Sequence, residues 1–425
     1  MRVSDIIRFY SNKDIRDRIL EFSKNREIMI RYKDKVGPRP DILMFDNDIL
    51  ESVKKGATSF HSSIERWSNP LFLKDIKSKK ELDNLRIGWD FIIDIDCPYV
   101  EYSKICANLL CEALEFHGVK NYSIKFSGGS GFHLGVPFES FPNEITGVNI
   151  KFAFPDAARI VAEYLRQMIK KHLADSLLEM HSLTEIGKNV GKSAGDLIQK
   201  EDFDPFSVIS IDTIAISSRH MIRMPYTFNE KKWLISIPIK RKDILSFNPI
   251  KDANPSSVTT ELSFLNISSK DEARQLFLQA FDWNKKMLST KIESISKTEA
   301  PKKAIKEEFF PPCIKLLLKG VEDGRKRGVF ILINFLRSCG WDINSIESKL
   351  KEWNLKNKEP LPENYINSQI NWHKQIQGSY LPPGCDNQGY LKDIGICKPD
   401  EICKLIKNPA AYPFKVMKRR WENGE

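Results

Sequence analysis

The chain has 425 residues, of which 41% are hydrophobic and 10% aromatic, enough for two or three domains with buried cores. Lys and Arg number 66 against 56 Asp and Glu, and the net charge of +10 favours a polyanionic partner, although a generally Lys-rich proteome gives the same excess. No apolar run approaches the roughly 20 residues of a membrane span, and no secretion signal follows Met1, so we expect a cytoplasmic protein without a membrane partner.

The chain begins with one helical pattern and one short strand pattern. Apolar residues recur at helical spacing over residues 4–23, and residues 27–32 have the composition of a strand that contains Arg31. Residues 37–40, Gly-Pro-Arg-Pro, predict a turn or loop after this strand.

Residues 89–98, Trp-Asp-Phe-Ile-Ile-Asp-Ile-Asp-Cys-Pro, predict a buried strand that ends in two carboxylates. Side chains two apart share one face of a strand, so Asp94 and Asp96 point the same way. Like charges at this spacing favour a cation between them, and carboxylate oxygen suits Mg²⁺ or Mn²⁺. Two such ions clamp the attacking and leaving oxygens in many phosphoryl transfers. A turn that Asp94 caps before Pro98 is the alternative interpretation.

A glycine-rich loop follows, after a predicted helix at about 100–117 and a predicted strand at 122–126. The loop has the sequence Ser-Gly-Gly-Ser-Gly-Phe-His and leads into a third strand at 134–136. Glycines let successive backbone N–H groups turn toward an anion, and hydroxyl and imidazole groups add donors. The phosphate-binding candidates are Ser127, Gly128, Ser130 and His133. A plain hairpin loop with a satisfied histidine is the alternative.

The next predicted elements are a long helix over residues 155–180, a polar loop over 181–205, and strands over 208–212 and 233–239. Asp212 ends the first of these strands and is the expected third metal ligand. Asp202 and Asp204 compete for that role, but they precede the strand. Arg223, and with it Arg219, carries forked donors that suit a triphosphate.

The last third of the chain is predicted to be helical. A helix at about 270–286 precedes a polar, Lys-rich tether at 285–308. Helices are then expected from residue 312, over 329–339, 343–355 and 363–377, with a basic turn of sequence Gly-Arg-Lys-Arg-Gly at 324–328.

Four cysteines in this last third are metal-ligand candidates, because they fall at turns or helix starts: Cys313, Cys385, Cys397 and Cys403. Cys339 ends an apolar helix and is expected in the core. The spacing of the four is not that of a C-x₂-C zinc module. Four thiolates suit Zn²⁺ or an iron–sulfur cluster equally, so the spacing does not decide between them.

The order of the N-terminal motifs resembles the catalytic subunit of the archaeo-eukaryotic DNA primases. The motifs are D-I-D on a strand, then S-G-x-x-G-x-H, then I-D followed by R-x-x-x-R-x-P, and the resemblance covers residues 10–245. It implies that Asp94, Asp96 and Asp212 hold two Mg²⁺ or Mn²⁺ ions. It also implies phosphate contacts from the nucleotide-binding group Ser127, Gly128, Ser130, His133, Arg223 and Arg31.

The sequence departs from this family at two positions of the expected nucleotide site. Ser130 stands where the family often has a basic residue, and Asn229 stands in place of a histidine after the R-x-P segment. No counterpart of the family's zinc knuckle is evident in this region.

Residues 309–414 resemble the C-terminal iron–sulfur domain of the primase large subunit. The shared pattern is P-P-C-I, then G-R-K-R-G, then P-P-G-C and two further cysteines before N-P. The resemblance implies a [4Fe–4S] cluster on Cys313, Cys385, Cys397 and Cys403. It implies that Arg325, Lys326 and Arg327 contact the nucleic acid and the 5′-triphosphate of the first nucleotide; a solvated helix start is the alternative.

We therefore expect a single-chain primase of the fused type known from nanoarchaeal lineages. An α+β catalytic module with an RRM-like sheet core and flanking helices would occupy residues 1–284, a linker 285–308, and an all-α iron–sulfur domain 309–425. The expected partners are a single-stranded DNA template, nucleoside triphosphates and an RNA or DNA primer, with the chain acting as a monomer or beside replication proteins. A primase-polymerase that mainly extends primers and a non-catalytic nucleic-acid-binding protein are the alternatives.

Overall fold

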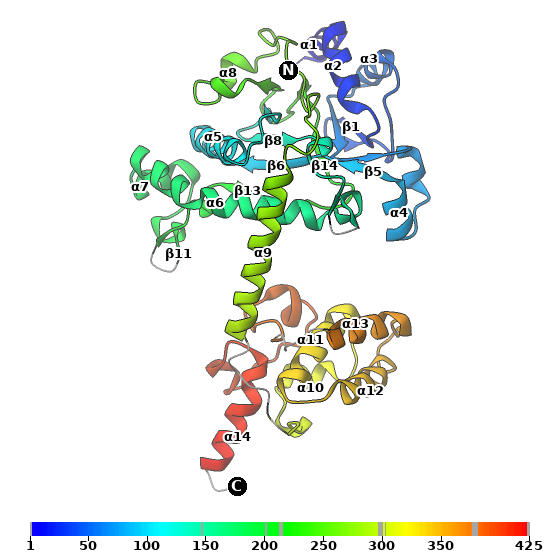
Figure 1. Cartoon of the computed structure of the whole chain (residues 1–425), viewed down its shortest axis with the longest axis vertical. Coiled ribbons are helices and arrows are strands. Elements are labelled where there is room, and N and C mark those ends of the chain that lie inside the picture. Colours follow the sequence, from blue (N-terminus) through cyan, green and yellow to red (C-terminus); the bar gives the residue numbers. More distant parts are fainter. Residues whose placement is uncertain are drawn as a thin grey trace. The chain divides into compact units, whose positions relative to one another are not determined.

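The computed structural model describes residues 2–145, 148–199, 202–211, 216–295, 301, 303–375 and 381–422. It divides into two compact units, Met1–Asn284 and Lys285–Glu425, each treated by itself (Figure 1). Among the described helices, none combines the length and the apolar character that a bilayer crossing demands.

The helical pattern over residues 4–23 is confirmed, and the structure divides it into two helices. Helix α1 spans Val3–Ser11 and helix α2 spans Lys13–Ser23. The side chain of Asn12 accepts a hydrogen bond from the backbone N–H of Asp14, which caps α2 and makes the division.

Two antiparallel sheets position the later site. The first has the order β14 (Met221–Arg223), β3 (Ser59–Ser63), β1 (Ile28–Tyr32), β2 (Lys35–Val36). The second has the order β13 (Ser210–Ile211), β6 (Phe91–Asp96), β8 (Phe132–Val136), β7 (Ser123–Phe126), β17 (Pro238–Ile239). The first unit is therefore a mixed α/β structure built on antiparallel sheets.

Alternation along the strands gives the second sheet one apolar face and one polar face. Ile93 pairs with Leu134, and Ile95 pairs with Phe132, so these buried side chains share the apolar face. Helix α5 (Val100–Phe116) packs against β6 and β8, and α6 (Asp156–Met180) packs against α5 (Figure 1). The helices predicted over 100–117 and 155–180 are thus confirmed.

The remaining elements of the first unit are short. They are α3 (Asp46–Lys54), β4 (Glu65–Trp67), α4 (Lys79–Leu85), β5 (Arg86–Trp89), β9 (Glu144–Ile145), β10 (Val148–Asn149), α7 (Leu183–Val190), β11 (Ile198–Gln199), β12 (Asp202–Phe203), β15 (Thr227–Phe228), β16 (Ile235–Ser236) and α8 (Pro249–Asp252).

Two predictions in this region are wrong. The predicted loop over 181–205 contains helix α7, because Ser182 and Glu185 form a capping box that starts it. The predicted strand over 233–239 is two strands in different sheets, with β16 paired to β15 and β17 paired to β7.

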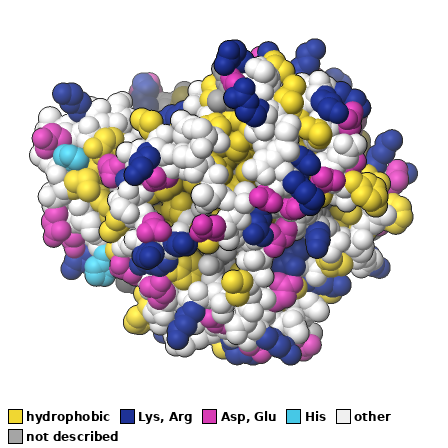
Figure 2. Space-filling model, turned by 90° about the horizontal axis from the view of Figure 1, so that it is seen from above, with side chains coloured by type: hydrophobic (Ala, Val, Ile, Leu, Met, Phe, Trp, Pro, Cys, Tyr) yellow, Lys and Arg dark blue, Asp and Glu magenta, His cyan; other side chains and the backbone are white. Residues whose placement is uncertain are grey.

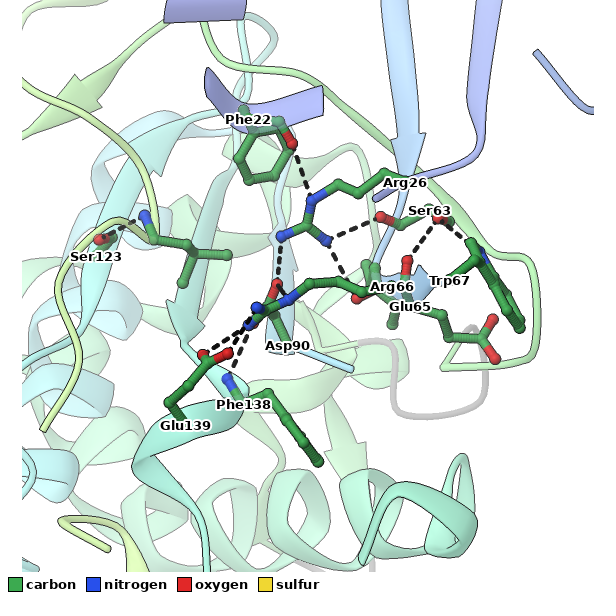
Figure 3. Close-up of polar contacts among 12 residues, drawn as sticks. Phe22, Arg26, Ser63, Glu65, Arg66, Trp67, Asp90, Ser123, Phe138 and Glu139 are labelled. Atoms are coloured by element: carbon green, nitrogen blue, oxygen red, sulfur yellow. Dashed lines mark hydrogen bonds and ion pairs between the residues drawn. The ribbon is translucent and has the colours of Figure 1, made fainter. Parts of the chain in front are cut away.

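A buried ion network fixes the start of strand β6 (Figure 3). The carboxylate of Asp90, which is fully buried, accepts from Arg26 and from Arg66, whose Nη2 lies 2.5 Å from Asp90 Oδ1. The backbone N–H of Phe138 donates to the same oxygen at 2.9 Å, and Glu139 pairs with Arg66 at 2.7 Å. Every contact of this network is internal to the protein, so Asp90 serves the fold.

All described elements of the second unit are helical. They include α10 (Pro312–Leu317), α11 (Arg325–Ser338), α12 (Ile343–Asn354), α13 (Glu363–Gln375) and α14 (Tyr412–Glu422). Their core includes Phe310, Leu332, Phe335 and Trp353, all buried.

Two boundaries differ from the sequence predictions here. Helix α9 runs over Arg274–Ile295 and so enters the segment predicted as a linker at 285–308, because Lys, Met, Leu and Glu in this stretch favour helix. The basic residues predicted in a turn at 324–328 lie in the first turn of α11, which begins after Gly324 at a positive φ of 77°.

Candidate active site

The polar face of the second sheet brings three charged side chains side by side. Asp94 pairs with His133 across β6 and β8, and His133 pairs with Lys125 across β8 and β7. His133 Nε2 lies 3.3 Å from Asp94 Oδ1. His133 was predicted where the chain re-enters the sheet after the glycine loop, and it is the second residue of strand β8, whose register puts its imidazole beside the first carboxylate.

The two carboxylates of the D-I-D motif differ in their proton affinity. Burial acts to raise the pKa of Asp94, but His133 and Lys125 outweigh it, so the pKa lies below the ordinary value. Burial and the charge of Asp94 raise the pKa of Asp96. The side chain of Asp94 is 46% exposed, and Asp96 is exposed as well. Both carboxylates are therefore accessible to a cation from solvent.

The first sheet contributes a second set of basic groups. His61 on β3 pairs with Arg223 on β14, and Arg31 on β1 pairs with Ser59 on β3. Burial and the nearby charge of Arg223 and Arg31 lower the pKa of His61 well below its usual value. The His61 imidazole is therefore neutral, and its Nδ1 is buried without a hydrogen-bond partner.

Phe228 and Glu230, on the hairpin formed by β15 and β16, hold the side chain of Arg223 in place. Its Nη2 lies 3.1 Å from Glu230 Oε2, and its Nη1 donates to the carbonyl of Phe228. Thr58 and Ser59 donate their hydroxyls to Glu230, the first at 3.0 Å. Burial acts to raise the pKa of Glu230, but Arg223 outweighs it and keeps the carboxyl ionised. Glu230 therefore orients the arginine at the site.

The glycine loop approaches two backbones so closely that side chains would not fit. A Cβ on Gly131 would lie 2.1 Å from the carbonyl oxygen of Ile95, and one on Gly128 would lie 2.9 Å from Cβ of Asn229. Gly128 also has a φ of 85°. The N–H of Gly129 donates to Ser127 Oγ at 3.3 Å. The loop therefore packs directly on strand β6 and on the Asn229 hairpin.

These elements enclose one cavity of about 330 Å³. Its lining residues are His61, Asp94, Asp96, Ser127, Gly129, Ser130, His133, His220, Met221, Ile222, Arg223, Asn229, Lys231 and Lys232. Six residues predicted from the sequence therefore meet in one place: Asp94, Asp96, Ser127, Ser130, His133 and Arg223.

The other predicted residues of this group have different outcomes. Gly128 supports the loop against Asn229 and is not part of the lining, and Arg31 acts on the site through its charge on His61 and Arg223. Asp212 lies outside the described residues, so its role stays a prediction. The last described residue of its strand, Ile211, pairs with Ile95, between Asp94 and Asp96.

Arg219 and Asp204, which the sequence offered as a further triphosphate-binding residue and an alternative metal ligand, both form ion pairs within the protein. Arg219 binds Glu27, with Nη2 2.6 Å from Oε1, and its backbone N–H donates to Glu65. Asp204 is buried and pairs with Lys170 at 3.2 Å. Neither residue lines the cavity, and the triphosphate role of Arg219 and the ligand role of Asp204 stay predictions.

The sequence analysis missed His61, His220, Lys231 and Lys232 in the cavity and Lys125 behind it. Lys125 is fully buried and donates from Nζ to Ser236 Oγ at 2.9 Å. Burial, together with the charge of Arg223, lowers its pKa well below the usual value. For Lys125 the available signal was a charged residue between the apolar residues Ile124 and Phe126 of a strand, whereas the strand of His61 is mostly polar and gave no such signal.

The cavity lining contains both cationic and acidic side chains. Lys and Arg side chains are interspersed with Asp and Glu over the face drawn in Figure 2. Within the cavity, Arg223, Lys231 and Lys232 face two carboxylates that suit divalent cations. The arrangement can therefore bind an anionic ligand together with a metal.

The four predicted cysteine ligands lie in the second unit: Cys313 in α10, Cys385 in a turn, Cys397 in a stretch without regular structure, and Cys403 at the start of a short 3-10 helix. Burial and the neighbouring thiols of Cys385, Cys403 and Cys397 raise the pKa of Cys313 to about 12. Cys339 is fully buried, and burial raises the pKa of its thiol to about 12. Among the described residues of the chain, no group of three or more His, Cys, Asp or Glu has a metal-holding arrangement. The cluster therefore stays a prediction.

The basic residues at the start of α11 have partners within their own unit. Arg325 pairs with Glu359 at 3.0 Å, Arg327 pairs with Asp393, and Lys326 Nζ lies 5.5 Å from the centre of the Tyr365 ring. Their carboxylate partners are largely exposed, so solvent weakens these pairs.

Comparisons with known proteins point to one family by sequence. No family model matches the chain. The DNA primase small subunit PriS of Archaeoglobus fulgidus is 26% identical over 201 residues, 39% of this chain and 58% of that subunit. The DNA primase large subunit PriL of Thermococcus kodakarensis is 28% identical over 145 residues, 25% of this chain and 36% of that subunit.

Other similarities are broader and less informative. An uncharacterised protein of Methanocaldococcus jannaschii is 24% identical over 286 residues, 63% of this chain and 62% of that protein. The polymerase domain of Mycobacterium tuberculosis Ligase D in complex with DNA matches 57% of this chain and 82% of that chain, with 13% identity and a TM-score of 0.36. The primase RepB' matches 86% and 95%, with 10% identity and a TM-score of 0.33. TM-scores this low carry no argument.

The chain spans less than two thirds of the length of each of these curated relatives. The similarity to PriS and to PriL is weak, but it involves both subunits of one enzyme. The chain is therefore similar in sequence to parts of an archaeal DNA primase small subunit and of an archaeal DNA primase large subunit.

Proposed function

We propose that this protein is a DNA-dependent primase that synthesises short primers on single-stranded DNA by metal-assisted nucleotidyl transfer. One observation carries the proposal: Asp94 and Asp96 line the same cavity as the glycine loop and the cationic side chains of Arg223, Lys231 and Lys232. A nucleoside triphosphate with divalent cations matches this pairing of carboxylates and phosphate donors.

The carboxylates fit Mg²⁺ or Mn²⁺. Both lie on one face of β6 and both are accessible, and two protein oxygens leave positions for water and phosphate oxygens, as Mg²⁺ requires. Asp212 is the proposed third ligand. When bound, two ions would activate the attacking hydroxyl and stabilise the charge on the departing pyrophosphate.

The protein's own groups would bind and orient the triphosphate. The hydroxyls of Ser127 and Ser130 and the loop N–H groups donate to phosphate oxygens, and Arg223, positioned by Glu230, provides a fixed charge. Burial and the charge of Lys125 lower the pKa of His133, so its imidazole is neutral, and we assign its single N–H to Nε2, where it donates to Asp94 and orients that carboxylate. Lys231 and Lys232 would supply the charge that Ser130 does not provide.

The second unit would serve initiation. Cys313, Cys385, Cys397 and Cys403 have the donor chemistry of a [4Fe–4S] cluster, and the influence of the other three thiols on Cys313 is consistent with one shared site. Arg325, Lys326 and Arg327 would contact the 5′-triphosphate of the first nucleotide. Holding two nucleotides on one chain lowers the entropic cost of making the first bond.

The test is synthesis by the purified chain on unprimed single-stranded DNA with Mg²⁺ or Mn²⁺ and labelled nucleotides, against an Asp94→Ala/Asp96→Ala variant. Short products that the variant does not make support a primase. Extension of an annealed primer without products on unprimed DNA would replace the proposal by a primase-polymerase. DNA binding without either activity would indicate a non-catalytic accessory protein.

The cluster has its own test, in which Cys385→Ser is compared with Cys339→Ser in anaerobic preparations. We expect Cys385→Ser to lose iron and the brown absorbance of the cluster, whereas Cys339→Ser keeps both. A colourless wild-type protein that contains zinc would overturn the assignment.

A further inference from the structure

A second, larger cavity adjoins the catalytic one. It measures about 730 Å³ and lies between the start of α5 and the segment that leads into α8. It shares Gly129, Ser130 and Lys232 with the catalytic cavity. The glycine loop therefore stands between the two spaces and contributes to the lining of both.

The second cavity has aromatic and aliphatic walls. Tyr99 and Phe247 contribute rings, and Leu234, Pro249 and Ile250 contribute aliphatic surface. The ring of Phe247 is fixed, since its centre lies 5.2 Å from that of Phe126 in β7. Ile250 is 77% exposed, so a large apolar side chain stands unpartnered at the rim.

The charged side chains that line this cavity are Glu101, Lys104 and Lys232, so the lining carries one more positive than negative charge. Lys104 is neutralised by Glu101, with Nζ 2.8 Å from Oε1. Within the described part of the chain, Lys232 has no acidic partner, and its ammonium group stands where the two cavities meet. A ligand with a flat apolar portion and one anionic group beside it matches this lining.

We propose that the second cavity holds a nucleotide of the single-stranded DNA template next to the catalytic cavity. Aromatic walls beside a cationic contact are how single strands are bound without sequence preference, with the bases stacked and the phosphate neutralised. The volume suits ligands of nucleotide size. The triphosphate already occupies the catalytic cavity in the proposed reaction, so the second cavity is left to a strand. The identification as template rests on that proposed function.

The experiment measures the affinity of the full chain for a fluorescently labelled single-stranded oligonucleotide by anisotropy, with a chelator and without nucleotides. The variants are Ile250→Asp and Lys232→Glu. The matched controls are Ile267→Asp, an exposed apolar residue outside the cavity, and Lys79→Glu, an exposed lysine of α4. Because stacking and charge contacts of this kind change affinity by about fivefold or more, we expect at least that loss for the cavity variants and no loss for the controls.

A parallel titration with a nucleoside triphosphate and Mn²⁺ separates the outcomes. Loss of nucleotide affinity in Ile250→Asp with unchanged oligonucleotide affinity would assign the cavity to the incoming nucleotide and overturn the inference. Equal oligonucleotide affinity in variants and controls would also overturn it. Weaker oligonucleotide binding in a protein that synthesises no product would support the binding site while the proposed primase activity fails.

Discussion

Asp90 and Asp94 stand four residues apart around the start of one strand, and their surroundings are opposite. Asp90 is fully buried and accepts from two arginines and a backbone N–H. Asp94 is half-exposed, touches one imidazole and faces a cavity. The first carboxylate has all its charge neutralised by the protein, whereas the second has capacity left for a ligand.

The difference teaches that residue type and spacing do not separate structural from functional carboxylates. Both residues lie in the same apolar segment, and both have a lowered pKa, Asp90 because Arg26 and Arg66 outweigh the opposing effect of burial. The distinction lies in what remains unsatisfied. A buried acid whose partners are all internal stabilises the fold, and an accessible acid with one partner can bind a cation.

Asp90→Ala should have the largest effect on stability. It leaves Arg26, which is buried, without its counter-charge, and breaking such a buried pair costs about 3–5 kcal/mol. Urea unfolding followed by circular dichroism measures this loss. A cost below about 1 kcal/mol would mean that Arg26 finds another partner and that the network is not structural.

Asp94→Asn should show the reverse pattern. Removing a metal ligand should lower synthesis by about a thousandfold or more, a loss of about 4 kcal/mol in transition-state stabilisation. Stability should change by less than about 1 kcal/mol, because the side chain is accessible and has one partner. Primer synthesis and urea unfolding of the same preparation check both parts. Unfolding comparable with that of Asp90→Ala would remove the contrast between the two residues.

The pH dependence of stability sharpens the comparison further. The folded pKa of Asp90 is below its unfolded value of about 3.9, so the stabilisation is fully present above that value and is lost as pH falls through the folded pKa. We expect the free energy of unfolding of the wild type to fall steeply below about pH 4. The free energy of unfolding of Asp90→Asn should be lower at neutral pH and should decrease less below about pH 4. Parallel curves for the variant and the wild type would contradict the assignment of Asp90 as a stabilising carboxylate.

Ser127→Ala should have the smallest effect of the series. The hydroxyl accepts from the N–H of Gly129, and a hydrogen bond to a charged phosphate contributes about 1.5–3 kcal/mol, of which the remaining loop donors can recover part. We expect KM for the nucleotide to rise by roughly tenfold at nearly constant kcat. A fall in kcat alone would move Ser127 from binding to the chemical step.

Much of the site was predictable because its residues follow strand periodicity. The two carboxylates on one face of residues 91–96 and the glycine loop between two strands follow from local rules, and they meet in the cavity as predicted. His61 and Lys231 were not predictable, because they reach the cavity through sheet pairings and a hairpin far along the chain.

The errors in the fold have equally local causes. The helical pattern over 4–23 did not show the break at Asn12, which caps a second helix, and a loop was predicted where Ser182 caps the start of α7. Asn12 and Ser182 are polar residues of types that occur both in loops and at helix caps, so their presence did not distinguish a loop from a helix start. Asp90 was not singled out as structural, since its partners Arg26 and Arg66 are distant in sequence.

Mn²⁺ binding followed by electron paramagnetic resonance, with a non-hydrolysable nucleoside triphosphate present, tests the central claim most directly. The control is Asp17→Asn, which removes an exposed carboxylate on α2 outside the cavity. We predict that the wild type and Asp17→Asn bind Mn²⁺ equally, and that Asp94→Asn keeps its fold but loses this binding. Equal Mn²⁺ affinity in a folded Asp94→Asn variant would contradict the assignment of this cavity as the metal-dependent active site.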